Sequence, residues 1–178
     1  MLSVKDVRKS YNKNEVLHGV SLSLNPGEIH GLIGENSAGK TTLIKCITGI
    51  YRTDSGSISV DDKPVFDNPE VKRVIGYVAD YNEYFKHYSA KKMVKMYQNF
   101  YPKFDTEKFN SMNANVELPL EKKISSLSKG QKMRLAIMLE IAKKPKYLIL
   151  DEPTSGLDPV AKDAFYRLLV KEVEENET

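Results

Sequence analysis

The sequence predicts an α/β domain with three parts: a core with a mainly parallel sheet, an N-terminal antiparallel β part and a helical part. Two stretches near the N-terminus, Leu2–Val7 and Val16–Leu24, alternate between apolar and polar side chains. A glycine-rich run at 34–41 leads straight into a helical pattern, and an apolar run at 147–150 ends in two carboxylates. Alternation indicates strands with one solvated face, whereas an unbroken apolar run indicates a strand that is buried on both faces.

The N-terminal third holds the predicted antiparallel strands. Leu2–Val7 and Val16–Leu24 alternate, and Asn25-Pro26-Gly27 favours a turn after them. Glu28–Ile33 is predicted to be a short strand that runs into the glycine-rich loop. A helix is expected next, from Lys40 to Gly49.

The middle of the chain changes from strands to helices. Further strands are predicted at Ser57–Val60 and Val74–Val78, and a helical pattern runs from Ser89 to Asn113. We interpret the residues on one side of that pattern as subdomain core and interaction face, not as a ligand cage: Met93, Met96, Tyr97 and Phe100.

The last third returns to the α/β pattern. A helix is predicted over Lys129–Ala142, because Pro145 cannot continue it, and Tyr147–Leu150 is predicted to be a buried strand. Asp158 as N-cap and Pro159 at the first helical position predict a final helix. We therefore expect one domain over 1–178, with an antiparallel β part (1–30, 50–70), a core (28–50, 145–178) and a helical subdomain (81–144).

Composition narrows the classes of function. The chain has 27 Lys and Arg against 24 Asp and Glu, a net charge of +3, and these cations are scattered, so no nucleic-acid partner is expected. Its one cysteine, Cys46, fits a reducing compartment and a place in the core. No apolar run approaches the roughly 18 residues that a membrane span needs. The sequence thus predicts a cytoplasmic protein that reaches a membrane only through a partner.

The glycine-rich run fits the phosphate-loop pattern G-x-x-x-x-G-K-[ST]. Glycines let successive backbone N–H groups turn inward toward phosphate oxygens, and the following helix adds its positive dipole end. Lys40 is expected to reach the β- and γ-phosphates, and the Thr41 hydroxyl to ligate Mg²⁺. The predicted nucleotide-binding residues of this run are Gly34, Glu35, Asn36, Ser37, Ala38, Gly39, Lys40, Thr41 and Thr42.

The two carboxylates after the apolar run are the predicted catalytic end of the sheet. A buried parallel strand delivers both acids to its carboxyl end, beside the phosphate loop. Asp151 suits the Mg²⁺ shell, and Glu152 suits the general base that polarises the attacking water.

Three further pieces resemble the ATP-binding subunits of ABC transporters, over essentially the whole chain. Leu127-Ser128-Lys129-Gly130-Gln131 resembles the signature loop LSGGQ, and the run from Asp151 to Asp158 looks like the Walker B strand end leading into the D-loop. Tyr11 stands where this family places its adenine-stacking aromatic residue.

The resemblance implies two chains that close head to tail over two Mg-ATP molecules. The signature loop of one chain then contacts the γ-phosphate that the other chain holds. The implied partners are a second ATPase subunit and one or more transmembrane permease subunits, which place the chain at the inner face of the cell membrane. The docking surface is expected between residue 81 and about residue 120, with these aromatic residues exposed: Tyr81, Tyr84, Phe85 and Tyr88.

Four departures from the family pattern matter. Ser37 replaces a common glycine, which is tolerated if it keeps an ordinary φ, and Lys129 replaces the first signature glycine, as in export-type and antibiotic-resistance subunits. Asp80 replaces the usual glutamine but remains a candidate Mg²⁺ ligand. No histidine follows Glu152, whereas the family has a switch histidine further on. We therefore expect a domain truncated at its C-terminus that binds nucleotide and hydrolyses it slowly.

Two other functions stay open at this point. One is an ABC ATPase that acts on nucleic acid or ribosomes, although no coiled-coil heptads and no second domain are found. The other is a nucleotide-sensing module without turnover, against which Lys40 and Glu152 argue.

Overall fold

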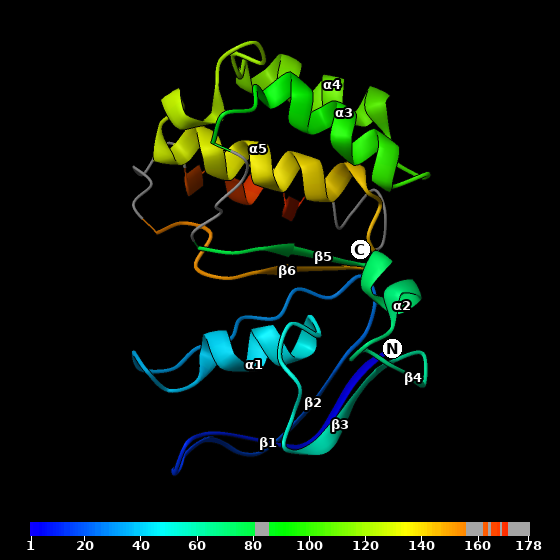
Figure 1. Ribbon diagram of the computed structural model, residues 1–178, viewed down its shortest axis with the longest axis vertical. Helices are drawn as coiled ribbons and strands as arrows, with labels where there is room; N and C mark the ends of the chain where they lie inside the picture. The colour runs from blue at the N-terminus through cyan, green and yellow to red at the C-terminus, as the bar shows by residue number, and fades with distance from the viewer. Residues whose placement is uncertain (81–85, 156–161, 164, 168, 171–178) are drawn as a thin grey trace.

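The N-terminal β part is a four-stranded antiparallel sheet. The computed structural model describes residues 1–80, 86–155, 162–163, 165–167 and 169–170. The antiparallel sheet has the strand order β2-β1-β3-β4 (Figure 1). The strands are β1 (Leu2–Tyr11), β2 (Asn14–Leu24), β3 (Ser55–Val60) and β4 (Lys63–Pro64).

Two parallel strands, β5 (Ile75–Val78) and β6 (Tyr147–Leu150), lie at the centre of the molecule. In Figure 1, α5 (Lys129–Ala142) lies above this pair and α1 (Lys40–Ile47) lies below it, between the pair and the antiparallel sheet. Ile75 at the start of β5 joins the apolar cluster of α1, whereas Val78 at its end joins the cluster of α5. The parallel pair therefore separates two apolar cores.

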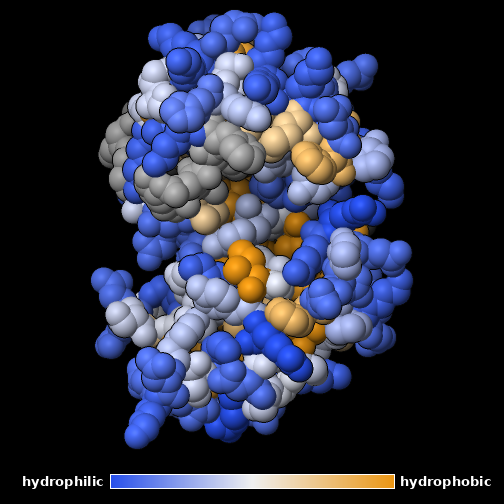
Figure 2. Space-filling model, in the orientation of Figure 1, coloured by the Kyte–Doolittle hydropathy of each residue, from blue (hydrophilic) through white to orange (hydrophobic). Residues whose placement is uncertain are grey.

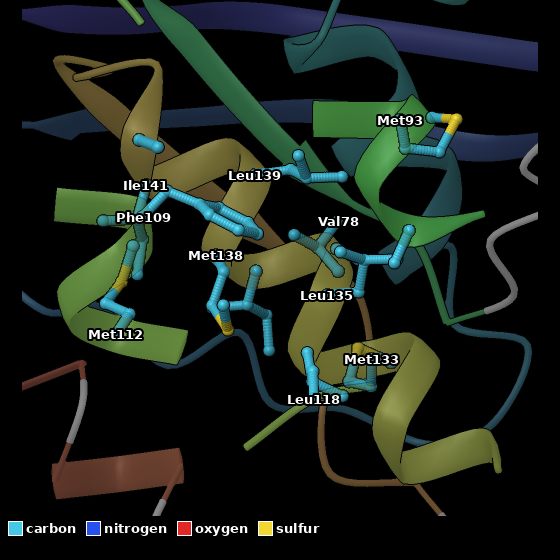
Figure 3. Packing of buried hydrophobic residues seen from close by; sticks show 14 of the residues in the cluster. Val78, Met93, Phe109, Met112, Leu118, Met133, Leu135, Met138, Leu139 and Ile141 are labelled. Atoms are coloured by element: carbon cyan, nitrogen blue, oxygen red, sulfur yellow. The ribbon is translucent and has the colours of Figure 1, made fainter. Parts of the chain in front are cut away.

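The helical part packs around α5. Its other members are α3 (Ala90–Phe100), α4 (Thr106–Val116) and the short 3₁₀ turn Ile124–Ser126. Phe109 of α4 and Leu135 and Leu139 of α5 are fully buried in one apolar cluster. In Figure 3, Phe109 lies near Met138 and Ile141 of α5, and Leu135 lies beside Val78 of β5. α5 is apolar nearly all round, as a helix buried between other helices and a sheet must be.

The second core lies under the antiparallel sheet. Leu2, Val4 and Val7 of β1 are buried against Leu43 and Cys46 of α1. Cys46 is therefore a core residue, as predicted. Most of the face in Figure 2 is hydrophilic, with apolar atoms visible at the waist between the two ends of the molecule.

Several predicted elements are confirmed and others need correction. The bounds predicted for α5 and β6 are those observed. The helical pattern predicted over Ser89–Asn113 is two helices, because Pro102 interrupts it and Asp105 caps α4 by accepting from Lys108 N at 2.8 Å. The sequence prediction also missed α2 (Pro69–Arg73), which the Asn68 side chain caps, and it missed β4. The start predicted for the final helix, at Asp158, lies outside the described residues.

The strand predicted at Glu28–Ile33 is wrong. The segment has no strand structure, and Ile29 and Ile33 are 66% and 93% exposed. A strand needs a neighbouring strand to take its backbone hydrogen bonds. Within the described residues no strand is paired with this segment, and β6 is paired only with β5. Separately, no described helix is long and apolar enough to cross a bilayer.

Candidate functional site

The phosphate loop is fixed where it enters α1. Gly39 is the N-cap of α1 and has a φ of 93°, a value that favours glycine. A Cβ atom there would lie 3.0 Å from Val16 Cγ1 and 3.1 Å from the Val16 carbonyl oxygen. The close approach of Gly39 to β2 therefore fixes the start of α1 beside the antiparallel sheet, and only glycine fits.

Lys40 folds back over its own loop. Its Nζ donates to the carbonyl oxygens of Gly34 at 2.7 Å and Glu35 at 2.8 Å, and Ala38 N donates to Glu35 O at 3.2 Å. These bonds hold the ammonium group at the rim of the loop, where a phosphate oxygen would exchange with the two carbonyl groups. Glu35, Asn36, Ser37 and Ala38 are exposed, and Thr42 is half-buried.

Ser37 does not keep the ordinary φ on which its tolerance was made conditional. Its φ is 69°, in the left-handed region. That conformation costs a non-glycine residue about 1 kcal/mol or more, which explains why glycine is common at this position of the pattern. Ser37 therefore adds local backbone strain to the phosphate loop, which nevertheless keeps its turn.

The sheet brings the Asp151 carboxylate to the phosphate loop. Asp151 N donates to Val78 O at 2.9 Å, which continues the parallel pairing of β5 and β6 by one residue. The Thr41 hydroxyl donates to Asp151 Oδ1 at 3.2 Å, although the two residues are 110 positions apart in sequence. Asp151 is only 5% exposed. A buried carboxylate thus meets the hydroxyl at the start of α1.

The oxygen atoms at this edge fit a hard divalent cation. Mg²⁺ prefers oxygen ligands and keeps several from water or phosphate. Besides Thr41 and Asp151, Asp80 follows β5 at the same edge of the sheet. Its Oδ1 is buried and accepts no hydrogen bond from any described residue. No group of three or more His, Cys, Asp or Glu side chains that could hold a metal occurs among the residues described, so a cation would need the threonine and phosphate oxygens as well.

Glu152 shares a cavity with Lys40 and Asp151. The cavity measures about 650 Å³, and apolar side chains of α1 and β6 line much of the rest. Glu152 is exposed and has a φ of 48°, and its carbonyl accepts from Ser155 N at 3.0 Å. Its carboxylate is therefore accessible to water at the end of β6, as a general base must be.

The signature loop is a helix cap. The Ser128 hydroxyl accepts from Gln131 N at 3.2 Å, and Gln131 Oε1 accepts from Ser128 N at 3.0 Å, which together form a capping box. The Ser128 hydroxyl still has its own proton to donate. Leu127 is buried. The N–H groups of Lys129 and Gly130 receive no side-chain cap from this box, so they remain at the positive end of α5.

Tyr11 lies at the tip of the β1–β2 hairpin, 41% exposed. Its ring meets that of Tyr51 edge to face, with 6.1 Å between centroids, and Lys9 Nζ is 6.0 Å from the Tyr11 centroid. Gly39 touches the same hairpin at Val16, so the hairpin adjoins the phosphate loop. The Tyr11 ring is thus exposed at the tip of a hairpin whose second strand contacts Gly39.

Some predicted residues lie outside the described part of the chain. They are Asp158 of the D-loop and Tyr81, Tyr84 and Phe85 of the docking surface. Tyr88 is described, and it is half-buried against the apolar cluster of the helical part instead of exposed as predicted. Lys92 Nζ lies 3.9 Å from its ring centroid.

Two residues near the site were missed in the sequence. Ser155 Oγ lies 3.5 Å from Lys129 Nζ, and nothing in the sequence pattern indicates that contact. Glu140 is a buried acid on α5 that accepts from Tyr77 N of β5. A single acid in the apolar run of α5 was the available signal, because buried carboxylates need partners.

The fold and the phosphate loop define a nucleotide-binding α/β domain of the P-loop class. Residues 17–155 match the family model described as "ABC transporter". The chain is 38% identical over 178 residues to the ABC transporter ATP-binding protein YtrB of Bacillus subtilis (strain 168), which covers 100% of this chain and 61% of that protein. It is 34% identical over 186 residues to the methionine import ATP-binding protein MetN of Clostridium tetani (strain Massachusetts / E88), covering 96% of this chain and 57% of that protein.

A solved structure shows the same fold. It is described as an ATP-binding subunit of an ABC transporter, and it superposes with a TM-score of 0.87 at 27% identity, covering 98% of this chain and 75% of that one. The chain therefore belongs to the ABC transporter family of ATP-binding proteins. It spans about 57–61% of the length of the two curated relatives named here.

Proposed function

We propose that this chain binds Mg-ATP and hydrolyses it to drive an ABC transporter. The contact between the Thr41 hydroxyl and Asp151 Oδ1 carries this proposal, because it joins the phosphate loop to the acidic end of the sheet. The family supports the nucleotide, since the relatives are named as ATP-binding proteins. The protein would lie at the cytoplasmic face of the membrane, held there by a transmembrane permease.

The loop residues bind and orient the triphosphate. Lys40 exchanges the Gly34 and Glu35 carbonyl oxygens for β- and γ-phosphate oxygens, while backbone N–H groups of the loop point at the same phosphates. Thr41, Asp151 and Asp80 would hold Mg²⁺, which neutralises phosphate charge when bound. The Tyr11 ring stacks on the adenine.

Glu152 acts on the attacking water. Its carboxylate accepts a proton from the water as the oxygen attacks the γ-phosphorus. The new oxygen–phosphorus bond forms in line with the bond to ADP, which breaks and leaves the electron pair on the ADP oxygen. Lys40 stabilises the negative charge that spreads over the transferred group.

A second chain would complete each site. In this arrangement the Ser128 hydroxyl and the N–H groups at the start of α5 that its capping box does not satisfy face the γ-phosphate held by the partner chain. Transport would then run through a transmembrane permease as a separate partner. In this arrangement the core would hold the nucleotide, and the helical subdomain would carry the signature loop and the docking surface.

Two variants test the proposal. Lys40→Met should weaken binding of a fluorescent ATP analogue by at least about tenfold, because the charged hydrogen bonds to phosphate are lost. Glu152→Gln should bind the analogue as the wild type does but lose about 10²-fold or more in turnover. Glu117→Gln is the matched control, since Glu117 is also exposed and also has a φ of 48°.

The outcomes separate the alternatives. If Lys40→Met binds as tightly as the wild type, the nucleotide site is wrongly placed. If the wild type binds but shows no turnover above that of Glu152→Gln, the chain acts as a nucleotide-sensing module. Turnover that rises with nucleic acid or ribosomes, instead of with a permease, would favour the other class of ABC ATPase.

A further inference from the structure

Two of the unusual residues in this chain lie against each other. Asp80 Oδ1 is 3.5 Å from Lys129 Nζ, so the carboxylate after β5 and the first residue of α5 form an ion pair. Each replaces an uncharged residue of the family pattern. Together they add no net charge to the site.

The ion pair is weak enough to exchange. The side chains of Lys129 and Asp80 are 52% and 44% exposed, and exposed ion pairs contribute little to folding. Asp80 Oδ1 itself is buried and receives no hydrogen bond from the described residues. A divalent cation has twice the charge of an ammonium group, so it would outcompete Lys129 for this oxygen.

The helix does not have to move for the pair to open. Glu140 of α5 holds the helix on β5, since its Oε2 accepts from Tyr77 N at 3.1 Å and from Lys143 Nζ at 2.6 Å. The Glu140 and Lys143 side chains are 7% and 5% exposed. Opening the surface pair therefore needs only a rotation of the Lys129 side chain.

Lys129 has a second partner at hand. Its Nζ is also 3.5 Å from Ser155 Oγ, in the turn that follows Glu152. An ammonium group displaced from Asp80 can keep this contact.

We propose that Lys129 is the exchangeable counter-charge of Asp80: it neutralises the carboxylate while no metal is bound and yields it to Mg²⁺ when Mg-nucleotide binds. The inference rests on the proposed function, because it takes Asp80 as a metal ligand. Lys129 is then a positioning residue that sets how strongly this site depends on metal.

The test compares two binding constants across a double-mutant cycle of Asp80→Asn, Lys129→Met and both together. Mn²⁺ binding is measured by electron paramagnetic resonance with a non-hydrolysable ATP analogue present, and binding of the same analogue is measured in EDTA. Lys129→Met should tighten Mn²⁺ binding by about three- to tenfold, because the competing cation is gone. In EDTA it should weaken analogue binding by about the same factor, because Asp80 is then an uncompensated negative charge.

Controls distinguish the pair from a general loss of charge. Lys132→Met removes another lysine of α5, and Lys132 forms no ion pair with any described residue. The changes that it causes in the two binding constants therefore measure the effect of losing one positive charge without losing an ion pair. Lys129→Arg should behave as the wild type. In the Asp80→Asn background, Lys129→Met should change both constants by less than about twofold.

Each result decides the matter. Shifts in the same direction in both assays, shifts equal to those of Lys132→Met, or shifts that persist with Asp80→Asn would overturn the inference and leave the proposed function intact. A wild-type chain that binds the analogue but no Mn²⁺ would overturn both.

Discussion

The helical part around α5 and the phosphate-binding side of the molecule are built in different ways. Phe109, Leu135 and Leu139 are fully buried in the apolar cluster of the helical part. On the phosphate-binding side, Ile29 and Ile33 are largely exposed, although a short strand was predicted over this segment. The helices form their backbone hydrogen bonds internally, whereas a strand depends on a neighbour.

That difference shows where stability and function reside. The helical part holds Glu140 and the capped start of α5 in fixed positions. The phosphate side depends on a loop with a left-handed serine and on one contact between Thr41 and Asp151. We therefore expect substitutions in the helical part to act on folding and those in the loop to act on binding.

The largest contrast should come from two truncations. Phe109→Ala should lower the free energy of unfolding by about 3–5 kcal/mol, because it empties a buried aromatic site. Ile33→Ala should change it by less than about 0.5 kcal/mol, since the side chain is 93% exposed. Urea unfolding followed by circular dichroism measures both. If Ile33→Ala lowered the free energy of unfolding nearly as much as Phe109→Ala, the comparison would fail, because the segment Glu28–Ile33 would then be packed in solution.

The next prediction concerns the buried ion pair between Glu140 and Lys143 in the helical part. Glu140→Gln should destabilise the fold by about 2–3 kcal/mol, because Lys143 is then a buried cation without its carboxylate. Glu121→Gln is the control, since Glu121 forms an exposed pair with Lys91 at 2.7 Å. It should change the free energy of unfolding by less than about 1 kcal/mol. Equal effects in the two variants would contradict the role given to burial.

A single glycine tests the strain in the loop. Ser37→Gly should stabilise the fold by about 0.5–1 kcal/mol, because the left-handed φ no longer meets a Cβ. Ser37→Ala keeps the Cβ and should give no gain. The unfolding midpoints of the wild type and the two variants test this prediction. If Ser37→Ala also raised the midpoint, the stabilisation would come from loss of the hydroxyl group instead of from relief of backbone strain.

The smallest effect concerns a surface contact that joins β6 to the antiparallel sheet. The Lys146 ammonium, with the N-terminal amine, lowers the pKa of Asp61 to about 2. A lowered pKa stabilises the fold above the unfolded pKa, near 3.8, and the gain is lost as pH falls toward 2. Asp61→Asn should therefore be less stable than the wild type at pH 5–7, by an amount that shrinks between about pH 4 and 2. A difference that stays constant down to pH 2, measured by urea unfolding, would exclude this linkage.

Local signals in the sequence predicted the bounds of two central elements. α5 and β6 have the predicted bounds, because an apolar helix before a proline and a short apolar run are both unambiguous. The break between α3 and α4 was readable from Pro102 and Asp105, yet the continuous apolar pattern obscured it. The failure at Glu28–Ile33 has another cause: a short run of residues can suggest a strand, but whether the strand forms depends on pairing with a distant part of the chain.

For the candidate site, spacing predicted the residues but not all of their contacts. The meeting of Thr41 and Asp151 was predicted, because a buried parallel strand delivers the acids at its carboxyl end to a site beside the phosphate loop. The φ of Ser37 and the proximity of Asp80 to Lys129 depend on loop geometry and on how α5 packs against β5. Neither depends on anything visible in a linear pattern.

The capping box at the start of α5 has a practical consequence for mutagenesis. Because the Ser128 hydroxyl closes the first turn of the helix, replacing it with alanine would fray that turn and remove any contact with a partner nucleotide in the same experiment. Threonine retains both the acceptor and the proton, whereas aspartate retains only the acceptor and adds a negative charge. A series from serine to threonine, aspartate and alanine would thus separate the upkeep of the helix end from the recognition of phosphate.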